Sequence, residues 1–491
     1  MKPKLILGLD IGTSSVRAGL YDERGDMLRD TFVKNERALD MTDDGGFEID
    51  AAIAFKQVVR TVDDVLAKAK KTAGDIEYAA SCAFWHSLVG VDKKGNPTTK
   101  VLGWGDTRSR MYSSVLKKRF DEAEVHNRTG ARFHSSFWPA KLLWLRSEFP
   151  KAFARTALWL SFSDFVALRL FGVAVTSVSM ASGTGIFDIR AGAWDAKLIR
   201  FLAIKAGDLP LVSDGSYTYP LLEKFRRRWP RLKPTGWFPA IGDGAANNVG
   251  SGCMKRSQAA LMIGTSGALR SAFEGDPPKS IPRGLWCYRV DRRRVIIGGA
   301  LSDGGGLYRW MLDNFQLDGS SDEELANRAP DSHGLTFLPF LGGERSTGYN
   351  EQASGGIVGL RSSSDAVDIA QAALESVAFR FAEIFDQLYG ICKVREIFAS
   401  GGALRRSTVW PQILADVLGR NLYLSGTAEA SMRGAVLLAL ETTGRIKKLE
   451  DASVPASMVF AADKSRKVVY QTARRRHQEL YKLLIDQERS E

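Results

Sequence analysis

The sequence predicts an α/β protein of two domains that share one building plan. The tetrapeptide Ile-Gly-Thr-Ser occurs at residues 11–14 and again at residues 263–266, and each copy stands between two apolar segments typical of strands. Strand and helix patterns alternate in both halves, and 491 residues are too many for one ordinary core. We expect a domain of residues 1–248, a domain of residues 249–491 and a central cleft between them.

The first half begins with strands and continues with a helix. Apolar and polar residues alternate through residues 5–21 and again through residues 27–33, which predicts a β-meander. A helical pattern covers about residues 49–71, and a strand pattern follows at residues 76–84. The core contacts expected of this helix are Ile53, Phe55, Val58, Val59, Val62 and Val65.

The second half repeats this order. A second meander begins near residue 259, and a strand is predicted at residues 294–300 and a helix at residues 305–315. The strongest helical pattern of the chain covers residues 365–389, and a strand at residues 396–400 leads into a pair of glycines. The buried face expected of the long helix consists of Ala370, Ala373, Leu374, Val377, Phe381, Ile384, Phe385 and Leu388.

The last predicted element is a polar helix over residues 465–487. We expect it to pack against the second domain rather than to bind a partner protein. Its apolar positions are Val468, Val469, Leu480, Leu483 and Leu484.

Each repeated loop has the chemistry of a phosphate-binding nest. Gly12 and Gly264 permit a positive φ and leave backbone N–H groups uncovered, and neighbouring hydroxyl groups add donors. The candidate phosphate contacts are Gly12, Thr13 and Ser14 in the first loop and Gly264 and Thr265 in the second. Two such loops favour two halves that hold one nucleotide, whereas an ordinary hairpin turn is the alternative for either copy alone.

The two loops differ in the residue that precedes them. Asp10 stands before the first loop and Met262 before the second, so only the first half offers a carboxylate for Mg²⁺. An ordinary turn aspartate is the alternative for Asp10. No Gly-x-x-x-x-Gly-Lys-Ser/Thr motif follows a strand and no His-Arg-Asp loop occurs, which disfavours a P-loop NTPase and a protein kinase.

Composition excludes several other classes. The formal charge of +12 comes from short and separated basic runs, which favours solvated surface charge over a nucleic-acid face. No apolar run is long enough to span a bilayer, and the N-terminus has no export-signal pattern. The four cysteines are scattered and indicate neither a zinc site nor a disulfide framework. We therefore expect a cytoplasmic protein that binds no membrane and no nucleic acid, and a homodimer is compatible with this interpretation.

With a Gly-Thr-Ser loop in each half and an aspartate before the first, the chain resembles the sugar-kinase branch of the actin-like (ribonuclease H-like) fold. More narrowly, it is similar to the FGGY carbohydrate kinases. Residues 355–360 and 368–375 match the C-terminal signature of that family, and residues 136–145 contain the Lys-x-x-Trp core of its N-terminal signature. Trp138 stands where the family usually has a small residue. The resemblance covers about residues 5–442.

Three further motifs resemble the gluconate kinase subgroup. They are residues 241–244 (Ile-Gly-Asp-Gly), residues 263–267 (Ile-Gly-Thr-Ser-Gly) and residues 340–345 (Phe-Leu-Gly-Gly-Glu-Arg). This resemblance implies a sugar acid as substrate, with ATP and Mg²⁺ as cofactors. Related kinases exchange polyol substrates through a few pocket residues, so xylulose, ribulose and other polyols remain alternatives.

Asp243 is the candidate general base. It follows an apolar segment and precedes small residues, which would present its carboxylate at a strand-to-helix joint with room for substrate. An ordinary helix N-cap is the alternative for this aspartate. The resemblance also implies that Gly401, Gly402 and Ala403 let the ribose or adenine of the nucleotide approach the backbone, whereas a plain helix-opening turn is the other interpretation.

Two segments of the first half resemble positions that contact the sugar. Trp85 and His86 end a strand, and a tryptophan face beside an imidazole suits a polyol. Asp106 and Arg108 lie in a segment that matches the Trp-x-Asp-x-Arg pattern of the family. A carboxylate substrate would pair with Arg108, whereas a salt bridge between Asp106 and Arg108 is the structural alternative.

The leading hypothesis is an ATP-dependent carbohydrate kinase whose two domains close over a sugar or sugar acid, most similar to gluconate kinases. Closure would expel water and limit ATP hydrolysis. An actin-like protein that uses nucleotide for binding or assembly is the alternative from another class. The third hypothesis is a regulator that keeps the fold but has weakened catalysis.

Overall fold

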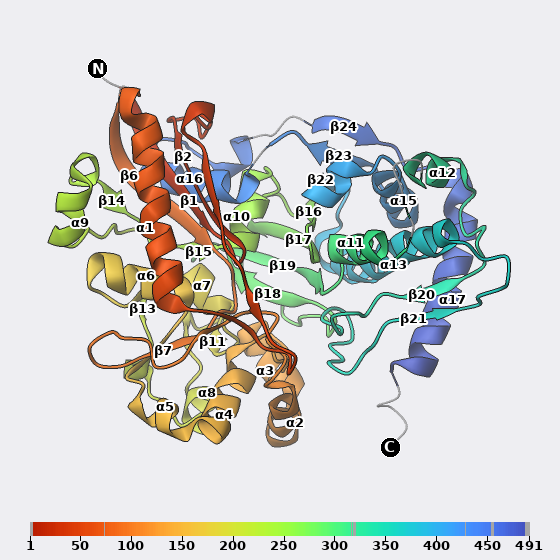
Figure 1. Ribbon diagram of the computed structural model, residues 1–491, viewed down its shortest axis with the longest axis horizontal. Coiled ribbons are helices and arrows are strands. Elements are labelled where there is room, and N and C mark those ends of the chain that lie inside the picture. The colour runs from red at the N-terminus through yellow and green to blue at the C-terminus, as the bar shows by residue number, and fades with distance from the viewer. Residues whose placement is uncertain are drawn as a thin grey trace.

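The computed structural model describes residues 3–486 except residues 73, 316, 318–320, 428 and 453–455. Two α/β halves lie side by side, each around its own sheet, and the N-terminal strands and the C-terminal helix lie at opposite sides of the molecule (Figure 1). The predicted fold class, with two α/β halves, is confirmed, and the boundary between residues 248 and 249 stays a prediction.

The first sheet has the order β14-β6-β1-β2-β3, with β15 also paired to β6. Strand β1 is antiparallel to β2 and parallel to β6, so the first repeated loop is the hairpin turn between β1 and β2. The strands are β1 (Lys4–Ile11), β2 (Ser15–Tyr21), β3 (Val33–Glu36), β6 (Asp75–Ala83), β14 (Gly236–Trp237) and β15 (Ile241–Gly242).

The second sheet repeats this core arrangement in the order β18-β19-β17-β16-β22-β23-β24. Strand β16 is antiparallel to β17 and parallel to β22, as β1 is to β2 and β6. The second repeated loop therefore occupies the equivalent hairpin turn. The strands are β16 (Gln258–Ile263), β17 (Gly267–Glu274), β18 (Trp286–Arg289), β19 (Arg294–Leu301), β22 (Glu396–Ser400), β23 (Leu422–Ser425) and β24 (Ala456–Phe460).

Helix α1 (Ala51–Lys68) packs against the first sheet because one face is apolar. The side chain of Asp50 caps its first turn by accepting a hydrogen bond from Ile53 N at 2.9 Å. Ile53 itself is 67% exposed, so its prediction as a core residue is wrong. The predicted residues that lie in the core are Phe55, Val58, Val62 and Val65, with Val59 partly buried.

Residues 27–33 do not form the predicted third strand. Met27 makes one isolated bridge to Tyr21, and residues 29–31 form a 3-10 turn. The hydroxyl group of Thr31 donates to Leu28 O at 2.6 Å and accepts from Leu20 N at 2.8 Å, which fixes the turn against β2. Strand β3 begins only at Val33.

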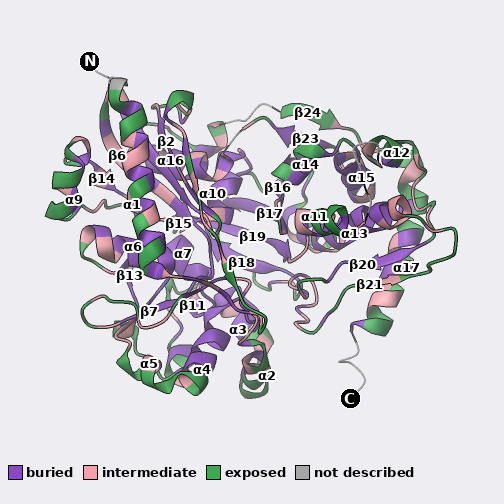
Figure 2. Ribbon diagram, viewed as in Figure 1, coloured by how far each residue is buried: buried purple, intermediate pink, exposed green. Residues whose placement is uncertain are grey.

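Helix α13 (Ala366–Cys392) is the long helix of the second half. A capping box between Asp365 and Asp368 begins it, and every residue predicted for its buried face lies in the second core. Figure 2 shows buried residues concentrated in the two sheets and in the helices between them.

The remaining elements of the first half surround its sheet. They are the helices α2 (Arg110–Arg119), α3 (Glu122–Thr129), α4 (Trp138–Glu148), α5 (Pro150–Arg155), α6 (Phe162–Phe171), α7 (Val178–Ser182), α8 (Ala196–Phe201) and α9 (Glu223–Arg228), and the short strands β4 (Asp40–Met41), β5 (Phe47–Ile49), β7 (Val89–Val91), β8 (Val101–Leu102), β9 (Leu158–Leu160), β10 (Val175–Ser177), β11 (Phe187–Asp188), β12 (Ala193–Trp194) and β13 (Leu211–Ser213). Those of the second half are α11 (Gly305–Asn314), α12 (Ser321–Asn327), β20 (Thr336–Leu338), β21 (Gly356–Val358), α14 (Gly402–Arg406) and α15 (Val409–Leu418).

Two crossing helices, α10 (Asp243–Gly250) and α16 (Ala430–Thr442), join the halves. Figure 1 places α10 between the sheets. Their backbones approach closely because glycine lies on both sides: a Cβ atom on Gly250 would stand 1.8 Å from Ala430 O, and one on Gly434 would stand 1.8 Å from Ala246 O. Helix α16 also packs against β1 and β6, so a late segment of the chain completes the first core.

The final helix, α17 (Lys467–Leu484), packs against the second half as expected, but through other residues. Its buried side chains are Tyr470, Ala473 and His477. Four of the predicted apolar contacts are exposed, namely Val468, Val469, Leu483 and Leu484. Residue 487, at the predicted end of this helix, lies outside the described residues.

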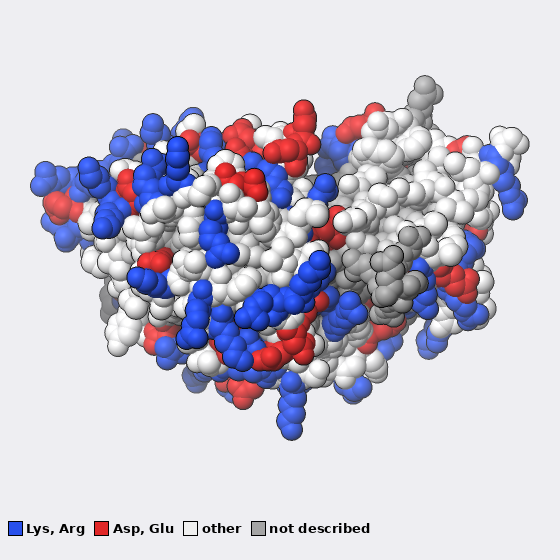
Figure 3. All heavy atoms as spheres, turned by 90° about the horizontal axis from the view of Figure 1, so that it is seen from below, with Lys and Arg blue, Asp and Glu red and all other residues white. Residues whose placement is uncertain are grey.

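The surface carries mixed charge. Figure 3 shows basic side chains gathered over the N-terminal half on the face seen from below, with acidic side chains interspersed among them. The helices within the described part of the chain include none with the length and apolarity needed to cross a membrane. All four cysteines are buried and free.

Candidate active site

The first repeated loop is a tight turn held by an arginine. Gly12 N donates to Ser15 O at 2.9 Å and closes the turn. Arg37 donates from Nε to Thr13 O at 2.7 Å and also to the carbonyl of Gly12, which fixes these two carbonyl groups. Ser14 is exposed. The loop is therefore ordered while its outer surface stays open.

The second loop packs against the beginning of α11. Gly264 N donates to Ser266 O at 2.9 Å, and Gly306 N donates to Thr265 O at 2.9 Å. The sequence suggested that Gly12 and Gly264 adopt a positive φ, but neither residue does. The sequence signal for the contact with α11 is the glycine run 304–306 in front of a helical pattern, and sequence reasoning did not use it.

The glycines after β22 reach the same loop. Gly401 has φ 117°, and a Cβ atom there would stand 2.1 Å from Ile263 O. Gly402 and Ala403 begin α14, and Ala403 lies against Gly305 at the start of α11. Residues 264–265, 304–306 and 401–403 therefore form one small-residue surface in the second half.

Asp10 lies near the end of β1 in a cluster of charges. Its carboxylate is 3.4 Å from Arg17 Nη1, which is also 3.0 Å from the carboxylate of Glu429 at the start of α16. Burial raises the pKa of Asp10 to about 6, Arg17 opposes this rise, and the negative charges of Asp243 and Glu429 add to it. Asp10 on β1 and Asp243 at the start of α10 are thus close enough to interact although they are far apart in the sequence.

Asp243 is the first residue of α10 and remains partly exposed. Its carboxylate accepts a hydrogen bond from Gly244 N at 2.7 Å and one from the backbone of Trp85. Burial raises the pKa of Asp243, and the positive charges of Arg270 and Arg345 oppose that rise. The strand-to-helix joint predicted for this aspartate is present.

Trp85 and His86 follow β6 and lie beside Asp243. The indole of Trp85 donates to Ser179 O at 3.0 Å and fills the space next to Gly242, where a Cβ atom would stand 1.9 Å from the ring. His86 adopts φ 68°, an uncommon left-handed conformation for a residue with a side chain. Its Nδ1 lies 2.5 Å from Gly183 O, so Nδ1 carries the proton and donates it.

The deprotonated Nε2 of His86 faces a residue of the second half. It lies 3.5 Å from Arg345 Nη2. Burial lowers the pKa of His86 well below its usual value, and the charge of Arg345 lowers it further. His86 is therefore neutral at pH 7 and accepts a hydrogen bond.

Lys141, from the signature on α4, ties this region together. Its buried ammonium group donates to His86 O, Gly103 O and Ser136 O at 3.1, 2.7 and 2.8 Å. Burial lowers its pKa to about 7, and the nearby charge of Asp106 opposes that change. Lys141 thus holds the loop of His86 next to the loop that leads to Asp106.

Asp106 and Arg108 pair with each other. Arg108 Nη2 lies 2.6 Å from Asp106 Oδ2 and 2.8 Å from the carboxylate of Glu48, and its guanidinium stacks 4.7 Å from the ring of Trp144. Asp106 is 1% exposed and also accepts from Phe47 N at 3.1 Å. Both side chains are engaged by other residues of the protein, which is the structural alternative considered for this pair.

Sequence reasoning missed four charged residues of this region: Arg17, Arg270, Arg345 and Glu429. Local signals existed for two of them: Arg270 is a charged residue inside an otherwise apolar strand pattern, and Arg345 ends the motif at residues 340–345. Arg17 and Glu429 come from segments distant in the sequence that the first sheet and α16 bring together.

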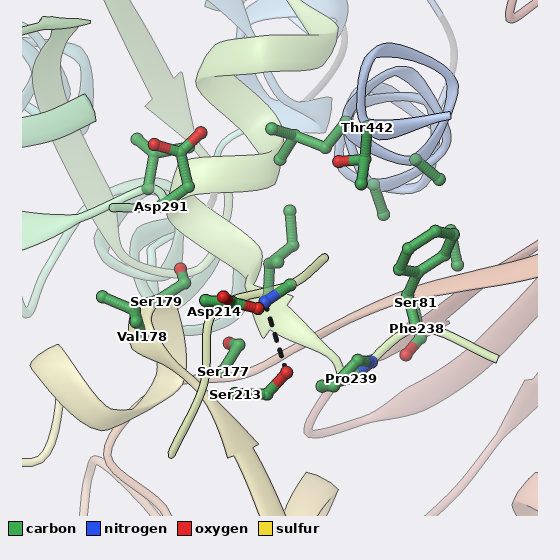
Figure 4. Close-up of a pocket in the computed structure, with 17 residues that line it drawn as sticks. Ser81, Ser177, Val178, Ser179, Ser213, Asp214, Phe238, Pro239, Asp291 and Thr442 are labelled. Atoms are coloured by element: carbon green, nitrogen blue, oxygen red, sulfur yellow. Dashed lines mark hydrogen bonds between the residues drawn. The ribbon is translucent and has the colours of Figure 1, made fainter. Parts of the chain in front are cut away.

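A separate pocket lies where the halves meet. Its lining includes Ser81 of β6, Asp291 after β18 and Thr442 at the end of α16, and Ser213 Oγ accepts from Gly215 N at 3.2 Å within it (Figure 4). None of the predicted site residues lines this pocket. It adjoins the region around Asp243 through Ser179, whose carbonyl accepts from the indole of Trp85.

Comparison with known proteins identifies the class of this protein. Sequence models for the N-terminal and C-terminal domains of the FGGY family of carbohydrate kinases match residues 5–225 and 259–442. The protein is a carbohydrate kinase, an enzyme that transfers a phosphoryl group to an alcohol. The chain belongs to the FGGY family, and membership implies the use of ATP.

Individual relatives agree with this membership. The gluconokinase of Bacillus subtilis strain 168 is 28% identical over 474 residues, which cover 91% of this chain and 89% of the relative. The ligand-bound xylulose kinase and the gluconate kinase of Lactobacillus acidophilus match with a TM-score of 0.90 each, at 26% and 25% identity, over 98% of each chain compared. The likeness confirms the two-domain actin-like fold.

Asp10→Asn should stabilise the ligand-free protein at alkaline pH. Because the folded-state pKa of about 6 exceeds the ordinary value of 3.8, proton uptake favours the folded state, and this contribution is lost as the pH rises through 6. We expect the variant to gain about 1–3 kcal/mol in unfolding free energy at pH 8 and little at pH 4. Urea unfolding at several pH values measures this, and a loss of stability at pH 8 would contradict it.

Proposed function

We propose that this kinase phosphorylates a hydroxyl group of gluconate or a closely related sugar acid with ATP, and that Asp243 is the general base. The observation that carries the proposal is the position of Asp243. Its partly exposed carboxylate begins α10, contacts the backbone of Trp85, and interacts with two arginines of the second half. The similarity to gluconokinases adds support for the substrate.

In the proposed reaction, the substrate lies between the residues after β6 and the start of α10. Asp243 accepts the proton of the attacking hydroxyl group as its oxygen forms a bond to the γ-phosphorus, and the bond between that phosphorus and the bridging oxygen of ADP breaks. His86 accepts from Arg345 through Nε2 and holds that arginine beside the substrate, and Trp85 supplies an apolar surface. Trp85, His86, Asp106 and Arg108 are retained as the proposed sugar-side residues, the last two as supports of the pocket wall.

We assign the nucleotide to the glycine-containing loops. Gly12, Thr13 and Ser14 would contact the phosphates from the first half, and Gly264 and Thr265 from the second. Gly401, Gly402 and Ala403 would lie against the ribose or adenine, because they pack next to the second loop without bulky side chains. Backbone N–H groups and hydroxyls in such loops suit phosphate oxygens.

Asp10 is the proposed holder of Mg²⁺. Asp10 and Glu429 both contact Arg17, and the negative charge of Asp243 acts on Asp10, so a divalent cation at Asp10 would relieve the repulsion that helps to raise its pKa. Bound Mg²⁺ would shield the charge of the phosphates. Asp10 would hold the cation, and water molecules would be its other ligands.

A substrate panel tests the proposed function. We expect purified protein to consume ATP with gluconate at a kcat/KM at least about tenfold above that for xylulose, ribulose or glycerol, because one charged contact contributes about 1.5–3 kcal/mol. The similarity to a xylulose kinase makes a preference for xylulose the second candidate. Such a preference would replace gluconate as the substrate, and a blank panel would contradict the proposal as a whole.

A further inference from the structure

Among the residues that the structure describes, Arg270 is a buried cation without a carboxylate partner. It lies on β17 and is 3% exposed. Within the described residues its guanidinium makes one side-chain hydrogen bond, from Nη2 to Asn247 Oδ1 at 3.5 Å, and its Nε has no partner. A buried charge is costly unless another charge and hydrogen bonds compensate it.

The other buried arginines of this protein are compensated. Among the described residues, five arginines are buried, and four of them have a carboxylate within 4.0 Å. Arg294 pairs with Asp291 at 2.7 Å and Glu441 at 2.5 Å, and Arg380 pairs with Glu383 at 2.6 Å and also with Glu344. The remaining two are Arg132, 2.6 Å from Glu122, and Arg289, 3.9 Å from Asp276. Arg270 is the exception.

The guanidinium of Arg270 faces the start of α10. A Cβ atom on Gly244 would stand 2.3 Å from Arg270 Nη1, so the cation touches the first turn of the helix that begins at Asp243. Burial lowers the pKa of Arg270 to about 10, and the charge of Asp243 is the largest opposing influence. The two groups interact, but they are too far apart to form an ion pair.

A second arginine approaches the same place from a loop. Arg345 Nη2 lies 3.5 Å from His86 Nε2, and its guanidinium is 5.6 Å from the ring centroid of Trp104. It makes no ion pair within the described part of the chain, and its charge acts on both Asp243 and Arg270. Its neighbour Glu344 is buried and accepts from Tyr481 Oη at 2.8 Å, which anchors the loop.

We propose that Arg270 and Arg345 together bind the carboxylate of the sugar acid beside Asp243. The position favours the substrate over the nucleotide, because Arg345 contacts His86 and Trp104 of the first half rather than the glycine-containing loops. Two guanidinium groups match a carboxylate by bidentate hydrogen bonds. A transferring phosphoryl group shares this anionic chemistry, and the experiment below separates the two. The inference rests on the proposed function, and it assigns the residues that select an acid over a neutral polyol.

The first test measures ligand binding by thermal shift. We expect wild-type protein to be stabilised by gluconate and by ATP, and Arg270→Gln and Arg345→Gln to lose the gluconate shift while they keep the ATP shift. Arg361→Gln removes an exposed arginine of the same half and should change neither shift. In kinetics, each site variant should raise the KM for gluconate by about 10- to 100-fold.

A second measurement separates a binding role from a structural one. Arg270→Met removes an uncompensated buried charge, so the ligand-free variant should unfold at the same temperature as wild type or at a higher one. Arg294→Met removes the ion-pair partner of Asp291 and leaves Glu441 with Arg293 alone, so it should lower the unfolding temperature by several degrees. A comparable loss in Arg270→Met would show that Arg270 supports the fold, and it would overturn the proposal.

Different experimental results would overturn the inference and the proposed function. If wild type ignores every sugar acid, the proposed substrate is wrong. If wild type phosphorylates gluconate but Arg270→Gln keeps the gluconate shift and loses only kcat, the arginines act on the phosphoryl group and the carboxylate assignment is overturned. Loss of the gluconate shift alone, with the ATP shift intact, supports it.

Discussion

Asp243→Asn should lower kcat by roughly 10²- to 10⁴-fold, the range expected for loss of a general base. Asparagine preserves the shape of the side chain and can still accept a hydrogen bond from Gly244 N, so the fold and α10 should persist. We expect the affinity for ATP to change by less than about threefold, because the glycine-containing loops are untouched. Steady-state kinetics with gluconate and a separate nucleotide-binding titration measure both quantities.

A matched control uses another aspartate at a helix start. Asp50 caps α1 away from Asp243 and accepts a hydrogen bond from Ile53 N at 2.9 Å. Asparagine caps helices about as well as aspartate, so Asp50→Asn should leave kcat unchanged. Turnover retained in Asp243→Asn would eliminate the assigned role, whereas equal losses in both variants would indicate general damage to the protein.

Gly434→Ala should cause the largest loss of stability. Its new Cβ atom would stand 1.8 Å from Ala246 O, so α10 and α16 would have to separate. Overpacking of this kind costs about 3 kcal/mol or more when the obstacle is backbone. Because α10 begins at Asp243, the same displacement should lower turnover by about 10²-fold. Chemical unfolding and kcat measure the two effects.

Gly390→Ala is the control for this substitution. Gly390 lies within α13 and is exposed, and a Cβ atom there would meet no neighbouring atom within 4 Å. Alanine at this position should raise the unfolding free energy by about 0.5–1 kcal/mol, since it favours helix. A Gly434→Ala protein with normal stability and turnover would show that the close approach of the two helices is unimportant for the site.

The duplicated core could be predicted because its signals are local. Each hairpin has apolar, strand-like segments on both sides of an identical tetrapeptide, and each is followed later by a strand that pairs in parallel. The strand predicted at residues 27–33 was wrong because the hydroxyl of Thr31 stabilises a turn there, which apolar periodicity cannot reveal. The contacts predicted for the final helix were wrong because its buried face consists of Tyr470, Ala473 and His477. Apolar periodicity does not favour a tyrosine and a histidine over the valines and leucines of the same helix.

The candidate site was predictable only where a motif marked it. Asp10 and Asp243 stand beside recognisable loops. The charge of Asp243 raises the pKa of Asp10, so the two carboxylates lie in one region. The motif at residues 340–345 contains Arg345 but does not assign it a contact, and no motif marked Arg270 as a ligand contact. Their significance comes from the absence of ion pairs among the described residues, which only the folded chain reveals. The pairing of Asp106 with Arg108 likewise depends on the side-chain geometry of a buried loop.

The most direct test is a crystal structure of Asp243→Asn with ATP and gluconate. We predict that one sugar hydroxyl lies within about 3 Å of the side chain at position 243 and in line with the γ-phosphorus, with the two repeated loops on either side of the phosphates. The sugar carboxylate should contact Arg270 and Arg345. A gluconate bound away from position 243, or phosphates held by only one of the two loops, would contradict the account.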